Sequence, residues 1–171
     1  MGIYFLDTCA LKHRYVAIDP AVARRVRWMV SEGRYEHFIA DVTVVEIAGA
    51  LASSCRAAGL GVAEFDSMDR AFFRDVSVGR LQIRATGQRE ALRARTLLRF
   101  AGVKQGRNLG SSDAVIASAC LILAQERQTK VIFYTADWAL YSVLHDIDAF
   151  RAAMCLRYLG APKGGMRGST C

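Results

Sequence analysis

Short apolar runs alternate with amphipathic stretches along this chain, and this alternation restricts its fold more than any other feature. The run from Ile3 to Leu6 is continuous and apolar, as is typical of a strand buried on both faces of a parallel sheet. A second clear run spans Lys130 to Thr135. Further strands are expected at Phe38–Ala40, at Leu81–Ala85 and, from a weaker pattern, at Met154–Leu156.

Helical patterns lie between these expected strands. Asp19 and Pro20 are a typical N-cap and first helical residue, and they predict a helix from about Ala21 to Ser31. Thr43 is expected to cap a helix that carries Glu46, and Thr86 a helix that runs through Arg99. Further helices are expected at Val62–Phe73, Ala114–Ala124 and Trp138–Leu144. This order predicts a three-layer α/β/α fold with a central, mostly parallel sheet.

Length and composition indicate one domain. A chain of 171 residues that is 53% hydrophobic can bury one sizeable core and is too short for two comfortable domains. We expect the domain to cover residues 1–160 and the glycine-rich, basic residues 161–171 to form a flexible tail. No apolar run approaches the roughly 18 residues of a membrane span, and no secretory signal pattern is visible, so a cytoplasmic protein is expected. The cysteines form no C-x-x-C pair, which argues against zinc.

Basic residues outnumber acidic ones, with 23 Lys and Arg against 16 Asp and Glu and a formal net charge of +7. This excess suits a polyanionic partner, although a generally cationic surface remains the alternative. The densest basic block follows the third expected strand. Its candidates for RNA binding are Arg89, Arg93, Arg95, Arg99, Lys104 and Arg107. A solvated helix face, or one that meets an acidic protein, would have the same composition.

Four acidic residues occupy comparable places in the predicted fold. Asp7 and Asp137 each follow an apolar strand, Asp113 begins an apolar helix, and Glu46 lies about one turn into the helix after the second strand. In an open parallel sheet these places converge near the carboxyl ends of the strands. Each acid also has an ordinary interpretation: Asp113 as a helix cap, Asp137 as a turn residue, and Glu46 as the partner of Thr43 in a capping box.

Clustering would change the chemistry of these acids. Two carboxylates about 4 Å apart repel each other by about 4 kcal/mol at an effective dielectric constant of 20. Such a cluster therefore needs bound protons or a cation. Hard oxygen ligands favour Mg²⁺ or Mn²⁺, so the pattern predicts a divalent-cation site.

The surroundings of the four acids form recognisable motifs. They are Phe5-Leu6-Asp7-Thr8, Thr43-Val44-Val45-Glu46, Ser112-Asp113-Ala114-Val115-Ile116-Ala117 and Tyr134-Thr135-Ala136-Asp137. In their order and structural context the motifs resemble those of the PIN-domain nucleases, and within them the VapC-like toxins of toxin–antitoxin pairs. The resemblance extends to about residue 160. There are two departures: the apolar stretch Trp138-Ala139-Leu140 follows the last acid, where the family often has polar residues, and the stretch between Glu46 and Asp113 is somewhat long.

The resemblance implies a PIN-like fold and a Mg²⁺- or Mn²⁺-dependent endoribonuclease. Asp7, Glu46, Asp113 and Asp137 would be both the catalytic and the metal-binding residues. Thr8 and Thr135 would orient these carboxylates through their hydroxyls. The implied partners are an RNA substrate, an antitoxin protein and a second copy of the chain.

Two alternatives stay open at this stage. One is a housekeeping PIN nuclease that processes ribosomal or other RNA without an antitoxin, and the other is a non-catalytic RNA-binding PIN module. Five aromatic residues are candidates for an exposed contact surface in a homodimer, with ordinary core packing as the alternative: Phe65, Phe72, Phe73, Trp138 and Tyr141.

Overall fold

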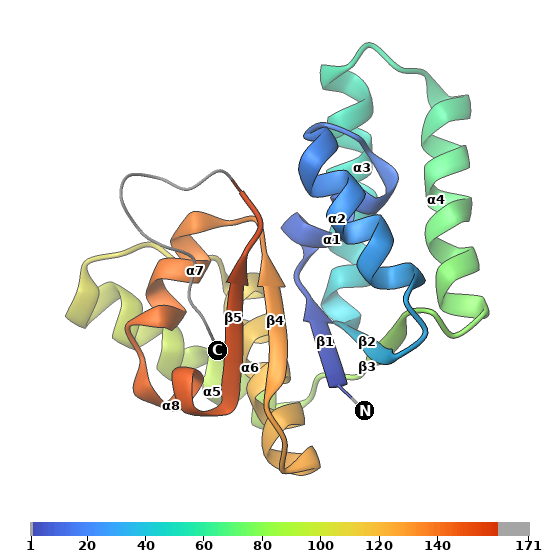
Figure 1. The fold of residues 1–171 in the computed structure, drawn as a ribbon. Helices are drawn as coiled ribbons and strands as arrows, with labels where there is room; N and C mark the ends of the chain where they lie inside the picture. Colours follow the sequence, from blue (N-terminus) through green and yellow to red (C-terminus); the bar gives the residue numbers. More distant parts are fainter. Residues whose placement is uncertain (1, 161–171) are drawn as a thin grey trace.

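A parallel sheet lies at the centre of the computed structural model, which describes residues 2–160 (Figure 1). Its five strands lie in the order β3-β2-β1-β4-β5, and all four strand pairings are parallel. The strands are β1 (Gly2–Leu6), β2 (Tyr35–Ala40), β3 (Gln82–Arg84), β4 (Val131–Thr135) and β5 (Met154–Tyr158). The structure confirms the predicted α/β class. The predicted tail, residues 161–171, lies outside the described residues.

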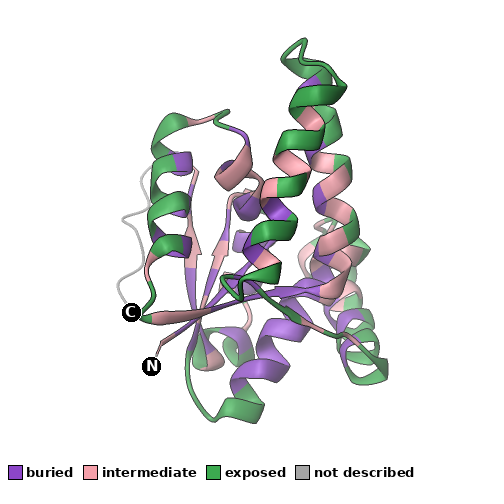
Figure 2. Cartoon of the chain, turned by 90° about the vertical axis from the view of Figure 1, so that its right-hand side faces the viewer, coloured by how far each residue is buried: buried purple, intermediate pink, exposed green. Residues whose placement is uncertain are grey.

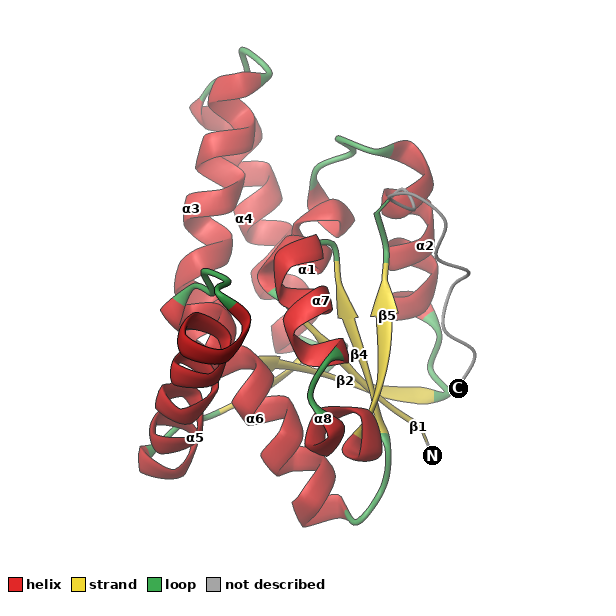
Figure 3. Ribbon diagram, turned by 90° about the vertical axis from the view of Figure 1, so that its left-hand side faces the viewer, coloured by secondary structure: helices red, strands yellow, loops and turns green. Residues whose placement is uncertain are grey.

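Helices cover both faces of this sheet and make the molecule three-layered (Figure 3). One face carries α1 (Thr8–Tyr15), α2 (Pro20–Ser31), α3 (Asp41–Ala57) and α4 (Val62–Ser77). The other carries α5 (Gln88–Arg99), the π-helical turn η1 (Phe100–Lys104), α6 (Ser111–Arg127), α7 (Trp138–His145) and α8 (Asp148–Ala153). None of the described helices is both long and apolar enough to cross a membrane.

The central strand, β1, is covered by helices on both faces, which explains its continuous apolar sequence. Ile3 and Phe5 pack into the core beneath α5, α6 and α7, whereas Tyr4 and Leu6 pack into the core beneath α1, α2 and α3. Successive side chains of a strand point to opposite faces, so a strand covered on both faces must be apolar at every position. Figure 2 shows the resulting burial in the middle of the molecule and the exposure of the outer helix surfaces.

Two predicted helix caps are wrong. Helix α3 begins at Asp41, directly after β2, so Thr43 is a buried residue inside the helix rather than its cap. Helix α5 has Gly87 as its N-cap, and Glu90 accepts a hydrogen bond from the Gly87 backbone at 2.9 Å. Thr86 instead donates to the Asp41 carboxylate, which ties the start of α5 to the start of α3. The Asp19 cap of α2 is confirmed.

The aromatic residues proposed as a contact surface have different environments. Phe72 and Tyr141 are buried in the two cores, so the contact-surface interpretation is wrong for them. Phe65 and Trp138 are half-buried against the cores. Phe73 alone of the five is largely exposed, at 52%.

Candidate active site

Asp7 and Asp137 follow β1 and β4, which are neighbours in the sheet. β1 lies between β2, which comes next along the chain, and β4, which is reached much later. In open α/β sheets such a reversal of strand order leaves a crevice outside the carboxyl ends of the strands. The Asp7 backbone N–H donates to the Tyr134 carbonyl at 3.1 Å and so extends the pairing of β1 with β4 into this crevice.

Both acids cap the helices that start there. Asp7 accepts a hydrogen bond from the backbone N–H of Ala10 at 2.6 Å, in the first turn of α1. One oxygen of Asp137 accepts from Ala139 at 2.6 Å and from Leu140 at 3.2 Å, in the first turn of α7. These hydrogen bonds hold each carboxylate against the N-terminus of its helix. They therefore fix the position of the two carboxylates at the ends of β1 and β4.

Thr135 connects the two acids. Its hydroxyl donates to the second oxygen of Asp7 and accepts from the Asp137 backbone N–H at 2.9 Å. Thr135 is completely buried at the end of β4, so this link is shielded from water. The hydroxyl thus has the orienting contact with Asp7 that the family resemblance implied.

Asp7 is the most deeply buried of the four acids, with a relative exposure of 1%. The pKa of its carboxyl is raised from 3.8 to about 7, chiefly by burial and to a smaller extent by the nearby carboxylates of Asp113 and Asp137. The hydrogen bonds from Thr135 and Ala10 act in the opposite direction without cancelling this rise. The ionised form of Asp7 is therefore disfavoured by burial and by its neighbouring carboxylates.

The other two acids, Asp113 and Glu46, lie on helices. Asp113 lies in the first turn of α6, whose N-cap is Gly110, so the simple capping interpretation of Asp113 is wrong. Burial raises the pKa of its carboxyl, and the neighbouring charges of Asp137 and Glu46 add to the rise. Glu46 lies in the second turn of α3 and accepts a hydrogen bond from the Thr8 hydroxyl. It forms no capping box with Thr43.

The donor chemistry of this group suits a hard divalent cation. All the candidate ligands are carboxylate oxygens, which Mg²⁺ and Mn²⁺ prefer. Within residues 2–160, however, no three His, Cys, Asp or Glu side chains form a ready-made metal cage. Zinc would require such a cage, whereas Mg²⁺ typically keeps several waters and binds through one or two carboxylates plus substrate phosphates. The residues therefore fit Mg²⁺ or Mn²⁺ better than zinc.

Two further residues, Cys9 and Tyr158, are influenced by the acids and were not singled out from the sequence. Cys9 follows Asp7 and Thr8 in the chain, and burial together with the Asp7 charge raises the pKa of its thiol to about 12. The charge of Lys12, three residues further along α1, opposes this shift. Tyr158, at the end of β5, has a phenol pKa raised by burial and by Asp137. Only the position of Cys9 beside Asp7 was a visible signal in the sequence.

The basic block has two kinds of arginine. Arg89 pairs with Glu126 at 3.2 Å, and Arg107 pairs with Asp146 at 2.9 Å, so both charges are partly compensated. Glu126 lies 13 residues after Asp113 on α6, or about 20 Å along the helix at 1.5 Å per residue. The Arg89 end of the block is thus far from the acids.

The remaining candidates of the block are exposed. The Lys104 ammonium lies 6.0 Å from the centre of the Phe100 ring. Within the described part of the chain, three arginines of α5 are exposed without an ion pair: Arg93, Arg95 and Arg99.

Fold and site together define an α/β protein with a group of acidic residues at the carboxyl ends of a parallel sheet. No protein-family model and no curated protein matches the chain. Solved structures are similar, among them VapBC-1 from nontypeable Haemophilus influenzae (17% identity, TM-score 0.58, covering 92% of this chain and 98% of that one). VapBC2 from Rickettsia felis, bound to a DNA fragment from its promoter, has 15% identity and a TM-score of 0.57 over 91% and 98% of the two chains.

FitAcB from Neisseria gonorrhoeae is also similar, with 14% identity and a TM-score of 0.57 over 89% of this chain and 95% of the other. At such low identity the similarity concerns the fold. The chain shares the three-layer α/β/α fold of these solved structures, as its sequence motifs predicted.

Proposed function

We propose that this protein is a Mg²⁺- or Mn²⁺-dependent endoribonuclease that uses Asp7, Glu46, Asp113 and Asp137. One observation carries the proposal: Asp7 is buried, and its ionised form is disfavoured both by this burial and by two nearby carboxylates. A buried cluster of this kind is costly unless a cation or a proton neutralises it. Strongly perturbed acids in a crevice are also a common property of catalytic sites.

The residues have distinct tasks in phosphodiester hydrolysis. A bound divalent cation supplies water of lowered pKa and neutralises charge that develops on the phosphate. Asp7, Asp113 and Asp137 would hold that cation directly or through water. Thr135 keeps the Asp7 carboxylate in one orientation, and Thr8 does the same for Glu46. Glu46 is half-buried at the edge of the group, where it can complete the cation site or accept a proton.

We further propose that the protein is the toxin of a type II toxin–antitoxin pair and that it forms a homodimer. The similar structures from Haemophilus influenzae and Rickettsia felis are VapBC complexes, and this likeness of fold supports the proposal. An antitoxin that places a cationic side chain among the acids would stabilise the ionised form of Asp7. A small antitoxin reading frame beside the gene would favour this role over a housekeeping nuclease.

The nuclease proposal is tested by mapping cleaved ends. Purified protein is incubated with a pool of transcripts in Mg²⁺ or Mn²⁺, and in parallel with EDTA. We expect cleavage at defined positions that requires the cation. Binding of the transcripts without cleavage in either cation would instead indicate a non-catalytic RNA-binding module.

Replacing Thr135 with valine should weaken the site without removing a carboxylate. The valine keeps the branched shape at the end of β4 but cannot donate to Asp7 or accept from Asp137. Loss of such an orienting hydrogen bond typically lowers activity or metal affinity about 10- to 100-fold. We expect a fall of that size in the cleavage rate at saturating Mg²⁺, and rescue by Thr135→Ser. A serine variant as impaired as the valine variant would contradict the orienting role.

The exposed arginines of α5 are expected to contact RNA phosphates. Replacing Arg93, Arg95 and Arg99 with glutamine should weaken RNA binding in EDTA for all sequences alike. Each phosphate contact contributes about 0.7 to the slope of log K against log salt for single strands. Loss of all three contacts should therefore lower the slope by about 2, as measured by fluorescence anisotropy over a salt series.

A matched control removes the same charge elsewhere. Arg56, Arg70 and Arg74 are exposed on α3 and α4, so their triple glutamine variant has the same net charge as the α5 variant. We expect a smaller loss of RNA affinity and a slope close to that of the wild type. Equal effects of the two triple variants would mean that only the overall charge matters.

A further inference from the structure

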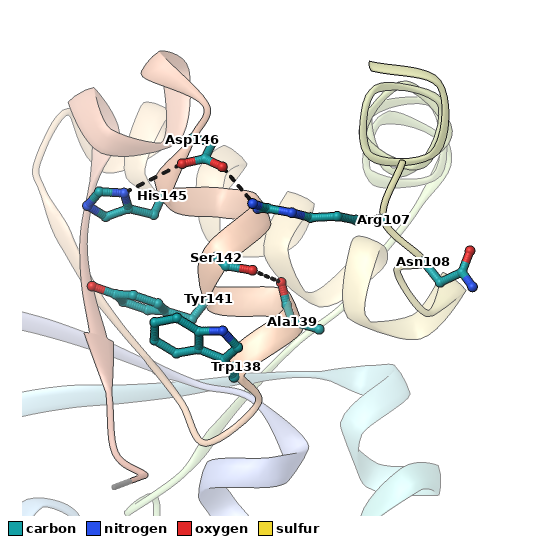
Figure 4. A pocket seen from close by; sticks show the side chains of 8 residues that line it. All are labelled: Arg107, Asn108, Trp138, Ala139, Tyr141, Ser142, His145 and Asp146. Carbon is teal, nitrogen blue, oxygen red and sulfur yellow. Dashed lines mark hydrogen bonds and ion pairs between the residues drawn. The ribbon is translucent and has the colours of Figure 1, made fainter. Parts of the chain in front are cut away.

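A pocket of about 430 Å³ opens between α7 and the segment that joins η1 to α6 (Figure 4). We call it the Trp138 pocket. Its walls come from Trp138, Tyr141 and Ser142 of α7 and from Arg107 and Asn108 of the joining segment, with His145 and Asp146 at the far end of α7. Its volume lies within the ordinary range for small-molecule sites.

The pocket has an aromatic wall with a defined geometry. The rings of Trp138 and Tyr141 are stacked, with centroids 5.5 Å apart and an interplanar angle of 29°. Tyr158 meets the indole edge-on at 5.2 Å and holds it from the sheet side. Trp138 is only half-buried, so a part of the indole stays open to solvent. Supported, partly open aromatic rings are the surfaces on which unstacked nucleobases pack.

Polar groups surround this aromatic wall. The Ser142 hydroxyl donates to the Ala139 carbonyl at 3.0 Å, so its oxygen remains able to accept from a ligand. The Asn108 side chain is exposed and can both donate and accept. Arg107 reaches across to Asp146 at 2.9 Å and fixes the joining segment against the end of α7. A mostly aromatic wall with a few donors and acceptors is typical of sites that recognise planar heterocycles.

The pocket is adjacent in the chain to one of the four acids, Asp137. Trp138 and Ala139 directly follow Asp137, and the carboxylate of Asp137 accepts from the Ala139 N–H at 2.6 Å. The pocket would thus lie next to a phosphodiester bound at the acids, because its lining residue Trp138 directly follows Asp137. The sequence places aromatic and small residues at this point, where polar residues are common in the family it resembles.

We propose that the Trp138 pocket binds one nucleobase of single-stranded RNA, next to the phosphodiester that is cut. The inference rests on the proposed nuclease function for its place in the substrate, and it adds the subsite that selects the base. A base stacked on Trp138 would be held while its backbone lies along the acids. Stacking of one base on an aromatic side chain contributes a moderate share of single-strand affinity and tolerates different bases. Selectivity would come from the polar groups around the wall.

The direct test follows the two indole N–H signals of the protein by NMR. The chain has only two tryptophans, and Trp28 is exposed on α2 outside the pocket, so it serves as an internal reference. The wild-type protein in EDTA is titrated with each of the four nucleoside 5′-monophosphates and with ribose 5-phosphate, which lacks a base. We expect at least one nucleotide to shift the Trp138 signal saturably, with a Kd on the order of 1 mM. Trp28 should not move.

A variant that fills the pocket tests whether the nucleotide binds there. Ala139 is an exposed lining residue of α7, and Ala139→Leu places a larger side chain in the pocket with little cost to the helix. Ala63→Leu, at an exposed position of α4, is the matched control. We expect Ala139→Leu to weaken the nucleotide at least tenfold and Ala63→Leu to leave its affinity unchanged.

The outcomes separate this inference from the nuclease proposal. An equal response to ribose 5-phosphate, a co-moving Trp28 signal, an unmoved Trp138 signal or unchanged nucleotide binding by Ala139→Leu would each overturn the base-binding pocket. None of these readouts needs cleavage or a metal ion. A protein that binds the nucleotide in this pocket but cuts no RNA would refute the nuclease and retain the pocket. If both hold, the base preference next to the mapped cut should flatten in Ala139→Leu.

Discussion

Replacing Asp7 with asparagine is expected to lower RNA cleavage by roughly a hundred- to a thousandfold, the range seen when one preorganised electrostatic group is removed from an active site. Asparagine has nearly the same shape and can still accept from the Ala10 N–H, so α1 keeps its cap. The variant loses the negative charge that would hold the cation. The rate is measured on the mapped substrate at saturating Mg²⁺, with circular dichroism as a check of the fold.

Asp19→Asn is the matched control for this substitution. Asp19 is also an N-cap acid at the start of a helix, but it caps α2 and is not among the acids that shift the pKa of Asp7 or Asp113. We expect its cleavage rate to match that of the wild type. Similar cleavage by Asp7→Asn and the wild type would remove Asp7 from the mechanism.

The second large effect concerns stability without a metal. Well below pH 3.8 the Asp7 carboxyl is protonated in both the folded and the unfolded chain. As pH rises from 3.8 to about 7, the unfolded chain ionises while the folded chain keeps its proton, so folding becomes less favourable. One pKa unit corresponds to 1.36 kcal/mol, so a rise of about 3 units corresponds to about 4 kcal/mol by the time pH exceeds 7.

Urea unfolding in EDTA over this pH range measures the effect. The difference in the free energy of unfolding between the wild type and Asp7→Asn should change by up to about 4 kcal/mol in favour of the variant as pH rises. Mg²⁺ should restore stability to the wild type, by about 2.7 kcal/mol at a concentration 100 times its Kd, and have little effect on the variant. Parallel pH profiles of the two proteins would show that Asp7 keeps an ordinary pKa in the folded state.

The sequence predicted the sheet and the positions of the acids because these depend on strong local signals. A buried parallel strand needs a continuous apolar run, and β1 and β4 both have one. An acid that follows such a strand must lie at the carboxyl edge of the sheet, so the strand assignments placed Asp7 and Asp137 at that edge. The structure adds that β1 and β4 are neighbours. The pairing of Asp7 with Tyr134 shows how closely the two ends meet.

Features that depend on distant contacts were not predictable in the same way. Thr43 and Thr86 have the chemistry of helix caps, but α3 continues from β2 without a loop, and Thr86 instead donates to Asp41, 45 residues earlier. The π-helical turn η1 has no periodic signal of its own. The acidic partners of Arg89 and Arg107 are also far along the chain, 37 and 39 residues away, so the sequence could not distinguish them from the unpaired arginines.

The raised pKa of Asp7 could not be predicted from the sequence either. The four motifs named the acids, but the complete burial of Asp7 and its contact with Thr135 arise only when β1 and β4 lie side by side. Burial raises the pKa of this aspartate to about 7, and the hydrogen bond from Thr135 opposes the rise without cancelling it. The Trp138 pocket, too, is formed by segments from two parts of the chain.

The most direct test of the divalent-cation site is a calorimetric titration of Mn²⁺ into the metal-free wild type, Asp7→Asn and Asp19→Asn. We expect saturable binding to the wild type and to Asp19→Asn, with proton release near pH 7 because Asp7 must ionise to bind. Binding to Asp7→Asn should be at least tenfold weaker. Equal affinity of Mn²⁺ for the wild type and Asp7→Asn, or no binding to either, would contradict a cation site at Asp7.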